Sequence, residues 1–431
     1  MNKFYHIHTY GCQMNVHESE KLAGALRDRG YASTDDVADA DIIVMNTCCV
    51  RGTAESKVYG HLGRLKSQKK RGAVLVVCGC MTQQPNVANE LAKRCPFVDI
   101  VLGTFNQYLL GEYIDNFLHT GVKTVDVWES QRDENCEGAA PYRTSGINAW
   151  VNIMYGCNNF CTYCIVPYVR GRERSRPIDD ILGEVDDLLK SGYKQITLLG
   201  QNVNSYAYKD KRFIDLLRML DCDRKYRLKF MTSHPKDISP ELASLYAQSK
   251  VLGKSLHLPV QAGSDRILEA MNRHYTHDEY LDKIAAFREQ IPDIGLSSDV
   301  MVGFPTETED DFMQTLDLVE RVRYNNLFMF IYSRRSGTPA DKMEQLDYKT
   351  KQARIDRLIK AQFEISKSLA SETVGNTYEV LVSDKTDGHC YGKTQYDAAV
   401  SFDSDAVEVG DFVNVKIISA KNANLRGEVV L

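Results

Sequence analysis

Three cysteines on one short stretch, Cys157, Cys161 and Cys164, constrain this chain more than any other feature. Their spacing is C-x3-C-x2-C, and an apolar run typical of a strand, residues 149–154, comes directly before them. Cysteine thiolates hold iron–sulfur clusters, and a fully ligated 4Fe-4S cube uses four of them. Three thiolates therefore predict a cube with one iron left open. The end of a strand is also where a (β/α) barrel carries its chemistry.

Zinc or free thiols are the alternative interpretation of the same three residues. A structural zinc site needs a fourth Cys or His nearby. Neither residue type occurs in the twenty positions after Cys164. The spacing therefore favours an iron–sulfur cluster over zinc, and it resembles the radical S-adenosylmethionine superfamily.

The length and charge of the chain limit what it can be. Its 431 residues are too many for one core and indicate about two to four domains. The N-terminus has no apolar signal region and no run approaches a membrane span, so we expect a cytoplasmic protein without a membrane segment. Twelve cysteines in such a chain favour reduced, metal-binding thiols over disulfides.

A net charge of -5 means that any RNA binding must be local. Three stretches are basic, namely residues 64–71, 170–176 and 349–357. Each by itself is more typical of a solvated face than of an RNA contact.

Three further cysteines occupy equivalent places in the first part of the chain. Residues 1–130 alternate strand-like and helix-like runs, which predicts a parallel α/β sheet. Cys12, Cys48 and Cys80 each follow a strand-like run. The crevice beyond the carboxyl ends of parallel strands is the usual binding place, so these cysteines are expected to converge on a second cluster.

The remaining cysteines are expected to be packing or surface residues. Cys78 lies inside an apolar run and is assigned to the core. Cys49 would point away from Cys48 if the backbone there is extended. The isolated cysteines are Cys95, Cys136, Cys222 and Cys390.

The rest of the chain divides into two more parts. Residues 131–146 are polar and form the expected linker. Six strands alternating with helices follow, which predicts an open partial barrel rather than a closed eight-stranded one. They are residues 149–154, 195–199, 227–231, 255–260, 296–302 and 326–332. A long helix over residues 348–372 leads to a tail predicted to be a small β-barrel.

With these residues placed, the chain resembles the methylthiotransferase family of radical S-adenosylmethionine enzymes over essentially its whole length. The resemblance rests on the runs YGCQMN at 10–15, NTC at 46–48 and GCM at 79–81, and on later motifs such as MNR at 271–273. It implies an N-terminal cysteine domain (1–130), a radical core (145–370) and a C-terminal TRAM domain for RNA binding (371–431).

The residue after the first cysteine separates the subgroups of this family. Gln13 is similar to the subgroup that acts on N(6)-dimethylallyladenosine in tRNA. Relatives that modify a ribosomal protein usually carry proline there, and those that modify threonylcarbamoyl-adenosine carry lysine. These two activities, and a non-catalytic iron–sulfur RNA-binding or electron-transfer protein, are the alternatives.

The resemblance also implies a division of labour between two 4Fe-4S clusters. The cluster on Cys157, Cys161 and Cys164 would cleave S-adenosylmethionine to start a radical reaction. The cluster on Cys12, Cys48 and Cys80 would present the sulfur. Carbon 2 of the adenosine at position 37 of tRNA would be methylthiolated, with two S-adenosylmethionine molecules used per product.

Residues near barrel strand ends are expected to hold S-adenosylmethionine or the base. They are Tyr163, Gly200, Gln201, Asn202, Gln261, Ser264 and Asp299. The implied partners are the tRNA anticodon stem-loop, an electron donor such as flavodoxin or ferredoxin, and an iron–sulfur or sulfide carrier. A monomer is expected.

The tail departs from the expected pattern of an RNA-binding module. From Ser371 onward it has ten acidic and five basic residues, whereas such a module is ordinarily basic. Either the contacts gather near Lys393, Lys421 and Arg426, or RNA is held by shape and stacking with help from the preceding helix.

Overall fold

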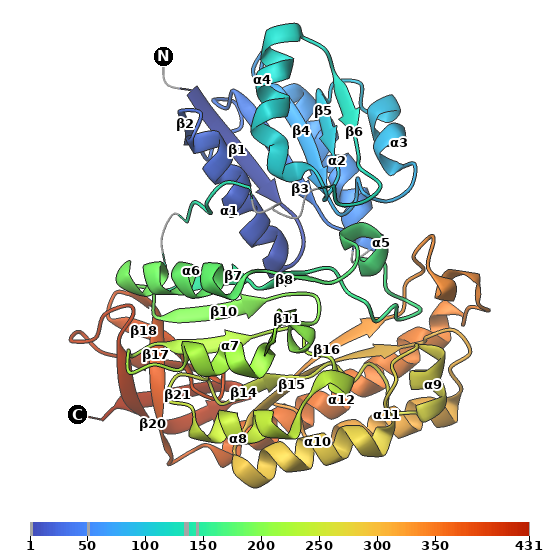
Figure 1. Ribbon diagram of the computed structural model, residues 1–431. Coiled ribbons are helices and arrows are strands. Elements are labelled where there is room, and N and C mark those ends of the chain that lie inside the picture. Colours follow the sequence, from blue (N-terminus) through green and yellow to red (C-terminus); the bar gives the residue numbers. More distant parts are fainter. Residues whose placement is uncertain (1–2, 50–51, 133–137, 144–145, 431) are drawn as a thin grey trace.

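The computed structural model describes residues 3–49, 52–132, 138–143 and 146–430 (Figure 1). A parallel α/β domain lies above a partial barrel, and a small closed barrel sits beside the latter. The predicted fold class is confirmed. Part of the predicted linker, including Cys136, lies outside the described residues. Nowhere in the described ranges does a helix combine the length and apolarity needed to cross a bilayer.

The first domain is a six-stranded parallel sheet with the order β2-β1-β3-β4-β5-β6. The strands are β1 (Lys3–Thr9), β2 (Tyr31–Ser33), β3 (Ile42–Thr47), β4 (Val74–Gly79), β5 (Ile100–Leu102) and β6 (Thr124–Asp126). β3 and β4 are buried along their whole length, because helices cover both faces of the sheet.

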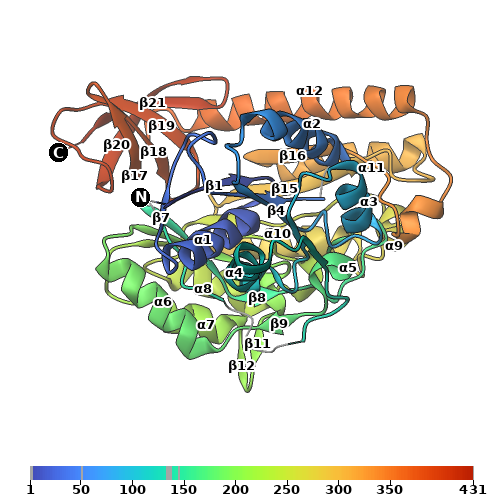
Figure 2. The same cartoon turned by 90° about the horizontal axis from the view of Figure 1, so that it is seen from above.

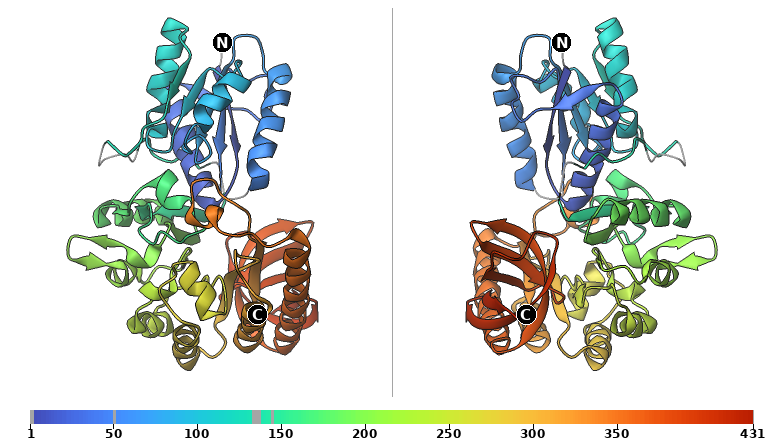
Figure 3. Two further views of the ribbon diagram at one scale, coloured as in Figure 1. Left: turned by 90° about the vertical axis from the view of Figure 1, so that its right-hand side faces the viewer. Right: turned by 90° about the vertical axis from the view of Figure 1, so that its left-hand side faces the viewer.

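Two pairs of helices provide that cover (Figure 3). α1 (Gln13–Arg27) and α4 (Leu110–Thr120) share a core with one face, and α2 (Gly52–Gln68) and α3 (Val87–Arg94) share a core with the other. Cys78 is fully buried in the first of these cores, as predicted. Cys95 is buried in the second, and Cys390 lies in the core of the small barrel.

All six strands predicted for the partial barrel are present, in two parallel groups of three. The first group is β7 (Asn148–Asn152), β10 (Gln195–Leu199) and β13 (Arg227–Phe230), and the second is β14 (Ser255–His257), β15 (Gly295–Val302) and β16 (Asn326–Ile331). The helices outside them are α6 (Ile178–Lys190), α7 (Phe213–Leu220), α8 (Pro240–Gln248), α9 (Asp265–Ala270), α10 (His277–Gln290) and α11 (Glu309–Val322). Strands and helices share one continuous apolar core.

Local sequence signals explain where the outer helices begin. α10 starts at a capping box in which Thr276 and Glu279 each bond the backbone N–H of the other. Thr308 and Asp311 do the same for α11. Such boxes satisfy amide groups that a helix N-terminus otherwise leaves without partners.

The helix predicted over residues 348–372 is α12 (Tyr348–Glu372), which spans about 37 Å. It runs along the barrel beside α11 and β16 and ends at the small barrel (Figure 2). That barrel closes in the order β17-β18-β19-β21-β20. Its strands are β17 (Thr377–Thr386), β18 (His389–Thr394), β19 (Ala399–Asp403), β20 (Phe412–Lys421) and β21 (Asn424–Val429).

Contacts between the two barrels account for part of the acidic excess in the tail. Asp397 pairs with Lys229 of β13 at 2.7 Å, and Glu379 pairs with Lys225 at 2.8 Å. The buried Arg227 donates to the carbonyl oxygens of Lys393 and Thr394 at 2.8 and 3.0 Å. These acidic side chains therefore hold the tail against the partial barrel.

The three basic stretches differ in exposure: the first is mostly exposed, as expected of a solvated face, whereas the middle and last stretches each contain buried basic side chains, which the sequence did not predict. In the first, Lys70 pairs with Asp41 at 2.8 Å. In the last, Arg354 is buried and pairs with Glu307 at 2.7 Å. Arg170 and Arg176 of the middle stretch are also buried. Arg170 bonds Cys80, which is far away in sequence, and Arg176 pairs with Glu184 of α6 at 2.8 Å, so the run alone did not show the pairing.

Candidate active site: two sets of three cysteines

Cys12, Cys48 and Cys80 lie at the carboxyl ends of three neighbouring strands. Cys48 and Cys80 come directly after β3 and β4, and Cys12 is the residue before α1, just beyond β1. Neighbouring strands are about 4.8 Å apart. The sheet order therefore brings the carboxyl ends of these three strands to one edge of the sheet, where the thiols are predicted to bind a cluster.

Two glycines let the loops of this first set approach one another. Gly11 has φ +114°, and a Cβ there would lie 2.8 Å from Sγ of Cys48. Gly79 has φ +102°, and its Cβ would lie 2.5 Å from the carbonyl oxygen of Thr47. Only glycine tolerates both the backbone angle and the contact. The loops before Cys12 and Cys80 are thus packed against the end of β3.

A hydrogen-bond network joins the same loops. The Nδ2 group of Asn15 donates to the carbonyl oxygens of Tyr10 and Thr47 at 2.7 and 2.9 Å. Its Oδ1 accepts from Nη2 of Arg170 at 2.7 Å. Nε of Arg170 also donates to Sγ of Cys80 at 3.2 Å. Asn15 belongs to the YGCQMN run, but its role could not be read from sequence.

Cys49 is a neighbour of this set that sequence reasoning missed. It is 1% exposed and packs with Cys80, Ile165 and Val169. Its hydrogen bond to Cys80, followed by the charge of Arg170, holds the pKa of Cys80 at about 6 despite burial. The bond and burial raise the pKa of Cys49 well above its usual range.

The second set occupies the loop from β8 (Met154–Tyr155) to α5 (Val166–Arg170). Cys157 and Cys161 are buried, and Cys164 is partly exposed. All three thiols therefore sit on one continuous turn of the chain, as the sequence predicted.

The shape of this loop depends on unusual backbone angles. Gly156 has φ +74°, and a Cβ there would lie 2.1 Å from the carbonyl oxygen of Arg172. Phe160 has φ +46°, a left-handed conformation that costs energy in a residue with a side chain. Its ring is covered by the Arg172 guanidinium at 4.3 Å and meets Tyr168 edge to face.

The MNR motif at 271–273 holds the loop in place. Nδ2 of Asn272 donates to the carbonyl oxygens of Asn159 and Phe160, both at 3.1 Å. The backbone N–H of Thr162 donates to the carbonyl oxygen of Met271 at 3.1 Å. The motif therefore fixes the backbone of the loop between Cys157 and Cys164.

Arg273 completes this support from a buried position. Its Nη1 donates to Sγ of Cys161 at 3.6 Å, and its Nη2 donates to the carbonyl oxygen of Pro259 at 2.8 Å. Its Nε donates to the hydroxyl of Tyr275 at 3.0 Å. Burial raises the pKa of Tyr163, which lies in the same environment, well above its ordinary value.

Burial also controls the protonation of the second set. It raises the pKa of Cys157 to about 11 and that of Cys164 to about 12. Both thiols are therefore protonated at neutral pH until a metal displaces the proton. Metal binding to such thiols releases protons and stabilises the thiolates.

Both sets fit a 4Fe-4S cube. Each offers three sulfur donors, glycine-dependent loops that close around them, and one buried arginine that donates to a ligand sulfur. Hydrogen bonds to ligand sulfurs are an expected outer contact of such clusters.

The polar residues after β10 lie at the interface with the first domain. Nε2 of Gln201 contacts Sδ of Met14 on α1. Asn202 is buried, and its Nδ2 donates to Oδ2 of Asp237 at 2.7 Å. Gly200 precedes both at the end of the strand. Their contact with a cofactor stays a prediction.

The other predicted residues lie near β14 and β15. Gln261 has φ +70°, and its backbone N–H donates to the carbonyl oxygen of Asp299 at 2.8 Å. The partly exposed Asp299 carboxylate lies 3.8 Å from Nε2 of His257. Ser264 is buried, and its hydroxyl donates to Asp311 at 2.6 Å. The Ser264 hydroxyl is thus already bonded within the protein.

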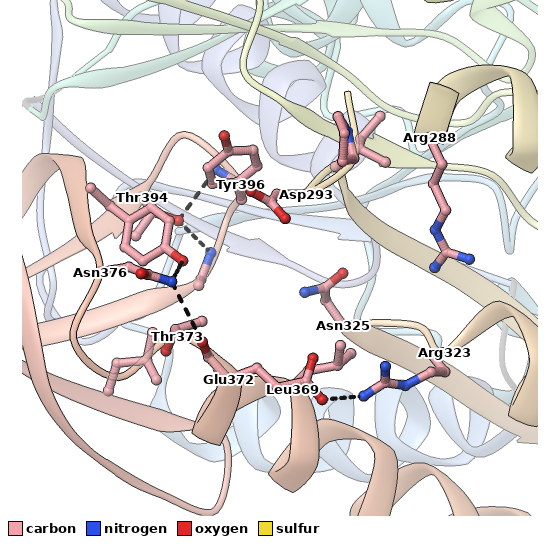
Figure 4. Close-up of a pocket in the computed structure, with 15 residues that line it drawn as sticks. Arg288, Asp293, Arg323, Asn325, Leu369, Glu372, Thr373, Asn376, Thr394 and Tyr396 are labelled. Atoms are coloured by element: carbon pink, nitrogen blue, oxygen red, sulfur yellow. Dashed lines mark hydrogen bonds and ion pairs between the residues drawn. The ribbon is translucent and has the colours of Figure 1, made fainter. Parts of the chain in front are cut away.

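Two hollows open where the partial barrel meets the small barrel. One of about 410 Å³ is lined by Lys229, His257 and Phe328 of the partial barrel and by residues of the small barrel, among them Lys393 of β18. The other, of about 290 Å³, lies between α10, α12 and the small barrel (Figure 4). Arg323 at its edge pairs with Glu372, and Tyr396 faces it from the opposite side.

A short stretch of chain links the second cysteine set to the first. α5 starts two residues after Cys164 and ends at Arg170, which bonds Cys80. Six residues span at most about 20 Å even when extended. The loop that holds one set therefore continues directly into the helix that covers the other.

Three family models match separate parts of the chain. The uncharacterized protein family UPF0004 matches residues 4–103, the radical SAM superfamily matches 151–319, and the TRAM domain matches 371–430.

Curated relatives match over the full length. A tRNA-2-methylthio-N(6)-dimethylallyladenosine synthase of Acetivibrio thermocellus is 48% identical over 99% of this chain and 91% of its own length. The synthase of the same name from Alkaliphilus oremlandii is 46% identical over 100% and 93%.

Solved structures share the fold at low identity. A radical S-adenosylmethionine methyltransferase from Kitasatospora setae has a TM-score of 0.59 at 15% identity, over 79% of this chain and 74% of that one. A cobalamin-dependent S-adenosylmethionine radical enzyme has a TM-score of 0.51 at 14% identity, over 85% and 56%.

Proposed function

The chain belongs to the family of the tRNA-2-methylthio-N(6)-dimethylallyladenosine synthases, and we propose that it attaches a methylthio group to carbon 2 of N(6)-dimethylallyladenosine in tRNA. The observation that carries this proposal is 48% identity to such synthases across all three parts of the chain. Two cysteine sets that each fit a cluster support it. We divide the chain into domains at residues 1–130, 145–370 and 371–431.

The two cysteine sets have different tasks in this proposal. When bound, the cluster on Cys157, Cys161 and Cys164 supplies reductive cleavage of S-adenosylmethionine, and the cluster on Cys12, Cys48 and Cys80 supplies the sulfur. The protein fixes both ligand sets. Asn272 and Arg273 hold the loop of the second set, and Asn15 joins the loops of the first.

Residues that contact S-adenosylmethionine or the base are proposed from their places after the barrel strands. Asp299 and Gln261 are the best placed, because they are adjacent in the backbone ladder and the Asp299 carboxylate is partly open. Ser264 supports the start of α9 through Asp311. Four more residues complete the proposed set, namely Tyr163, Gly200, Gln201 and Asn202, of which Gln201 contacts Met14 of the first domain.

The RNA surface is proposed on the small barrel and the adjoining hollow. Lys393 and Arg426, which the sequence favoured, pair with Asp397 and Asp403. Tyr391 is 50% exposed and offers a stacking surface. A base in the anticodon loop is unpaired and is cheaper to flip than a paired base. Stacking therefore suits this barrel better than charge alone.

Several partners belong to the same proposal. A reductant such as flavodoxin or ferredoxin would supply electrons, and an iron–sulfur or sulfide carrier would restore the sulfur. We propose that the protein acts as a monomer in the cytoplasm, where its tRNA substrate is found.

The direct test uses protein reconstituted anaerobically with iron and sulfide. Anticodon stem-loop RNA carrying N(6)-dimethylallyladenosine is compared with the same RNA lacking the dimethylallyl group, with threonylcarbamoyl-adenosine RNA and with a ribosomal-protein peptide. Mass spectrometry should find methylthiolation of the dimethylallyl RNA alone. A product formed only on the peptide or on threonylcarbamoyl RNA contradicts the proposal. Absence of 5'-deoxyadenosine would favour a non-catalytic iron–sulfur protein.

A further inference from the structure

Arg170 is a residue of the partial barrel whose guanidinium reaches into the first cysteine set. We propose that Arg170 is a positioning residue that binds the ligand loops of the first cluster together, raises the reduction potential of that cluster, and couples it to the loop of the second. The proposal rests on the proposed function only in requiring that a cluster assembles on Cys12, Cys48 and Cys80.

The burial of this arginine is the first argument. Arg170 is only 7% exposed. A buried charge destabilises the folded state unless it is paired and hydrogen-bonded. The guanidinium lies against the first set, because its Nε donates to Sγ of Cys80 at 3.2 Å. A metal-bound cysteine is a thiolate, so the ligand itself would supply a negative partner for the buried charge.

Glu18 is an acidic residue near Arg170, and both line the same small hollow. Its carboxylate accepts from Nε2 of Gln107 at 2.7 Å and from Nδ2 of Asn152 at 3.2 Å. These neutral amides orient the carboxylate and leave its charge unchanged. The guanidinium itself bonds Cys80 and Asn15, so a cluster thiolate would be the ionised group in direct contact with Arg170.

The planar guanidinium is the second argument. Nε bonds Cys80 and Nη2 bonds Asn15, which in turn bonds the carbonyl oxygens of Tyr10 and Thr47. The guanidinium is therefore linked to the loops of all three ligands, directly at Cys80 and through Asn15 at the other two. Lysine has the same charge but a single ammonium group in place of the planar guanidinium, so it can make only one of the two bonds at a time.

The position of Arg170 in the chain is the third argument. It is the last residue of α5, six residues beyond Cys164. Val169 of the same helix and Ile165, the residue before the helix, pack on Cys80 and Cys49. The carbonyl oxygen of Val169 also accepts from Thr104 of the first domain. A displacement of the second-set loop is thus transmitted to the first set.

The chemical consequence concerns the reduction potential of the first cluster. Hydrogen bonds to cluster sulfurs and nearby net charge set that potential. A buried cation that donates to a ligand sulfur stabilises the more negative, reduced form. Removing it should therefore make the potential more negative.

The experiment compares Arg170→Met, which removes charge and fork, with Arg170→Lys, which keeps the charge. Arg354→Met is the matched control, because Arg354 is similarly buried at 5% exposure and pairs with Glu307 far from either cysteine set. Full-length protein is reconstituted anaerobically. Iron content is measured, and redox titration is followed by electron paramagnetic resonance without RNA. Addition of S-adenosylmethionine identifies the signal of the second cluster.

The proposal expects the potential of the first cluster to shift negatively in Arg170→Met and by less in Arg170→Lys. Arg354→Met should lower thermal stability and leave the potential unchanged. An unshifted potential in Arg170→Met overturns the proposal. If Arg170→Met assembles only one cluster, the proposal is tested on Arg170→Lys. A wild-type potential and signal in Arg170→Lys overturn the proposal, and a negative shift of its potential supports it. Wild-type protein with only one cluster would instead contradict the proposed function.

Discussion

The two cysteine sets use the same number of thiols but depend on the fold in opposite ways. Cys157, Cys161 and Cys164 share one loop, whereas Cys12, Cys48 and Cys80 come from three strands separated by 36 and 32 residues (48 − 12 and 80 − 48). The first arrangement needs one loop to adopt its backbone angles. The second exists only after β1, β3 and β4 have paired, and such non-local pairing is the slow, entropically costly part of folding.

Each set also has one buried arginine that donates to a ligand sulfur. Arg273 lies 3.6 Å from Sγ of Cys161 and comes from the same domain. Arg170 lies 3.2 Å from Sγ of Cys80 and comes from the other domain. The local set is thus supported from within the partial barrel, and the assembled set requires both domains.

The largest expected effect follows from breaking the local set. Cys157→Ala should abolish both 5'-deoxyadenosine and methylthiolated RNA, because no open iron remains to bind S-adenosylmethionine. Iron should fall from about eight to about four per chain, since the first set is retained. Product analysis by mass spectrometry together with iron assay checks this. Residual 5'-deoxyadenosine at the wild-type rate would mean that these thiols are not the radical site.

A smaller effect is expected from crowding the assembled set without touching a ligand. Gly11→Ala places a Cβ against Cys48 at a positive φ, which costs about 1–3 kcal/mol in strain alone. It should lose the first cluster, about four irons per chain, while 5'-deoxyadenosine formation persists. Gly63→Ala on α2 is the control, because its Cβ would meet nothing within 4 Å. Full iron content in Gly11→Ala would show that the close approach is not needed.

The sequence could predict the features that depend on local spacing but not those that depend on contacts between distant parts of the chain. The C-x3-C-x2-C loop, the six barrel strands and α12 depend on local spacing and periodicity, and the structure has them where they were expected. Arg170, Asn15 and Cys49 could not be assigned to the first set, because their contacts cross between domains or strands. The acidic composition of the tail was a poor guide to its surface for the same reason, because Glu379 and Asp397 pair with lysines of the partial barrel.

The smallest expected effect concerns the interface on which the assembled set depends. Glu20 of α1 lies 3.3 Å from Nε of Arg143, which also pairs with Glu184 of α6 at 2.8 Å. Burial raises the pKa of Glu20 from 4.5 to about 7. The native state therefore holds this proton more tightly than the unfolded chain. The stabilisation is complete below about pH 4.5 and is lost as pH rises to about 7.

Glu20→Gln removes this titration. The unfolding free energy of the wild type minus that of the variant should fall between pH 4.5 and 7 and stay level above. Denaturant unfolding at pH 5, 6, 7 and 8 measures this difference. A difference that increases with pH would show that Glu20 is stabilised as a carboxylate by Arg143.

The central claim is that radical generation and sulfur supply reside in different cysteine sets, and one variant tests it most directly. The triple variant Cys12→Ala, Cys48→Ala and Cys80→Ala is reduced anaerobically with S-adenosylmethionine and dimethylallyl RNA, and both products are measured. The account predicts 5'-deoxyadenosine without methylthiolated RNA. Methylthiolated RNA from this variant would contradict it, because the first set would then not be the obligatory sulfur site.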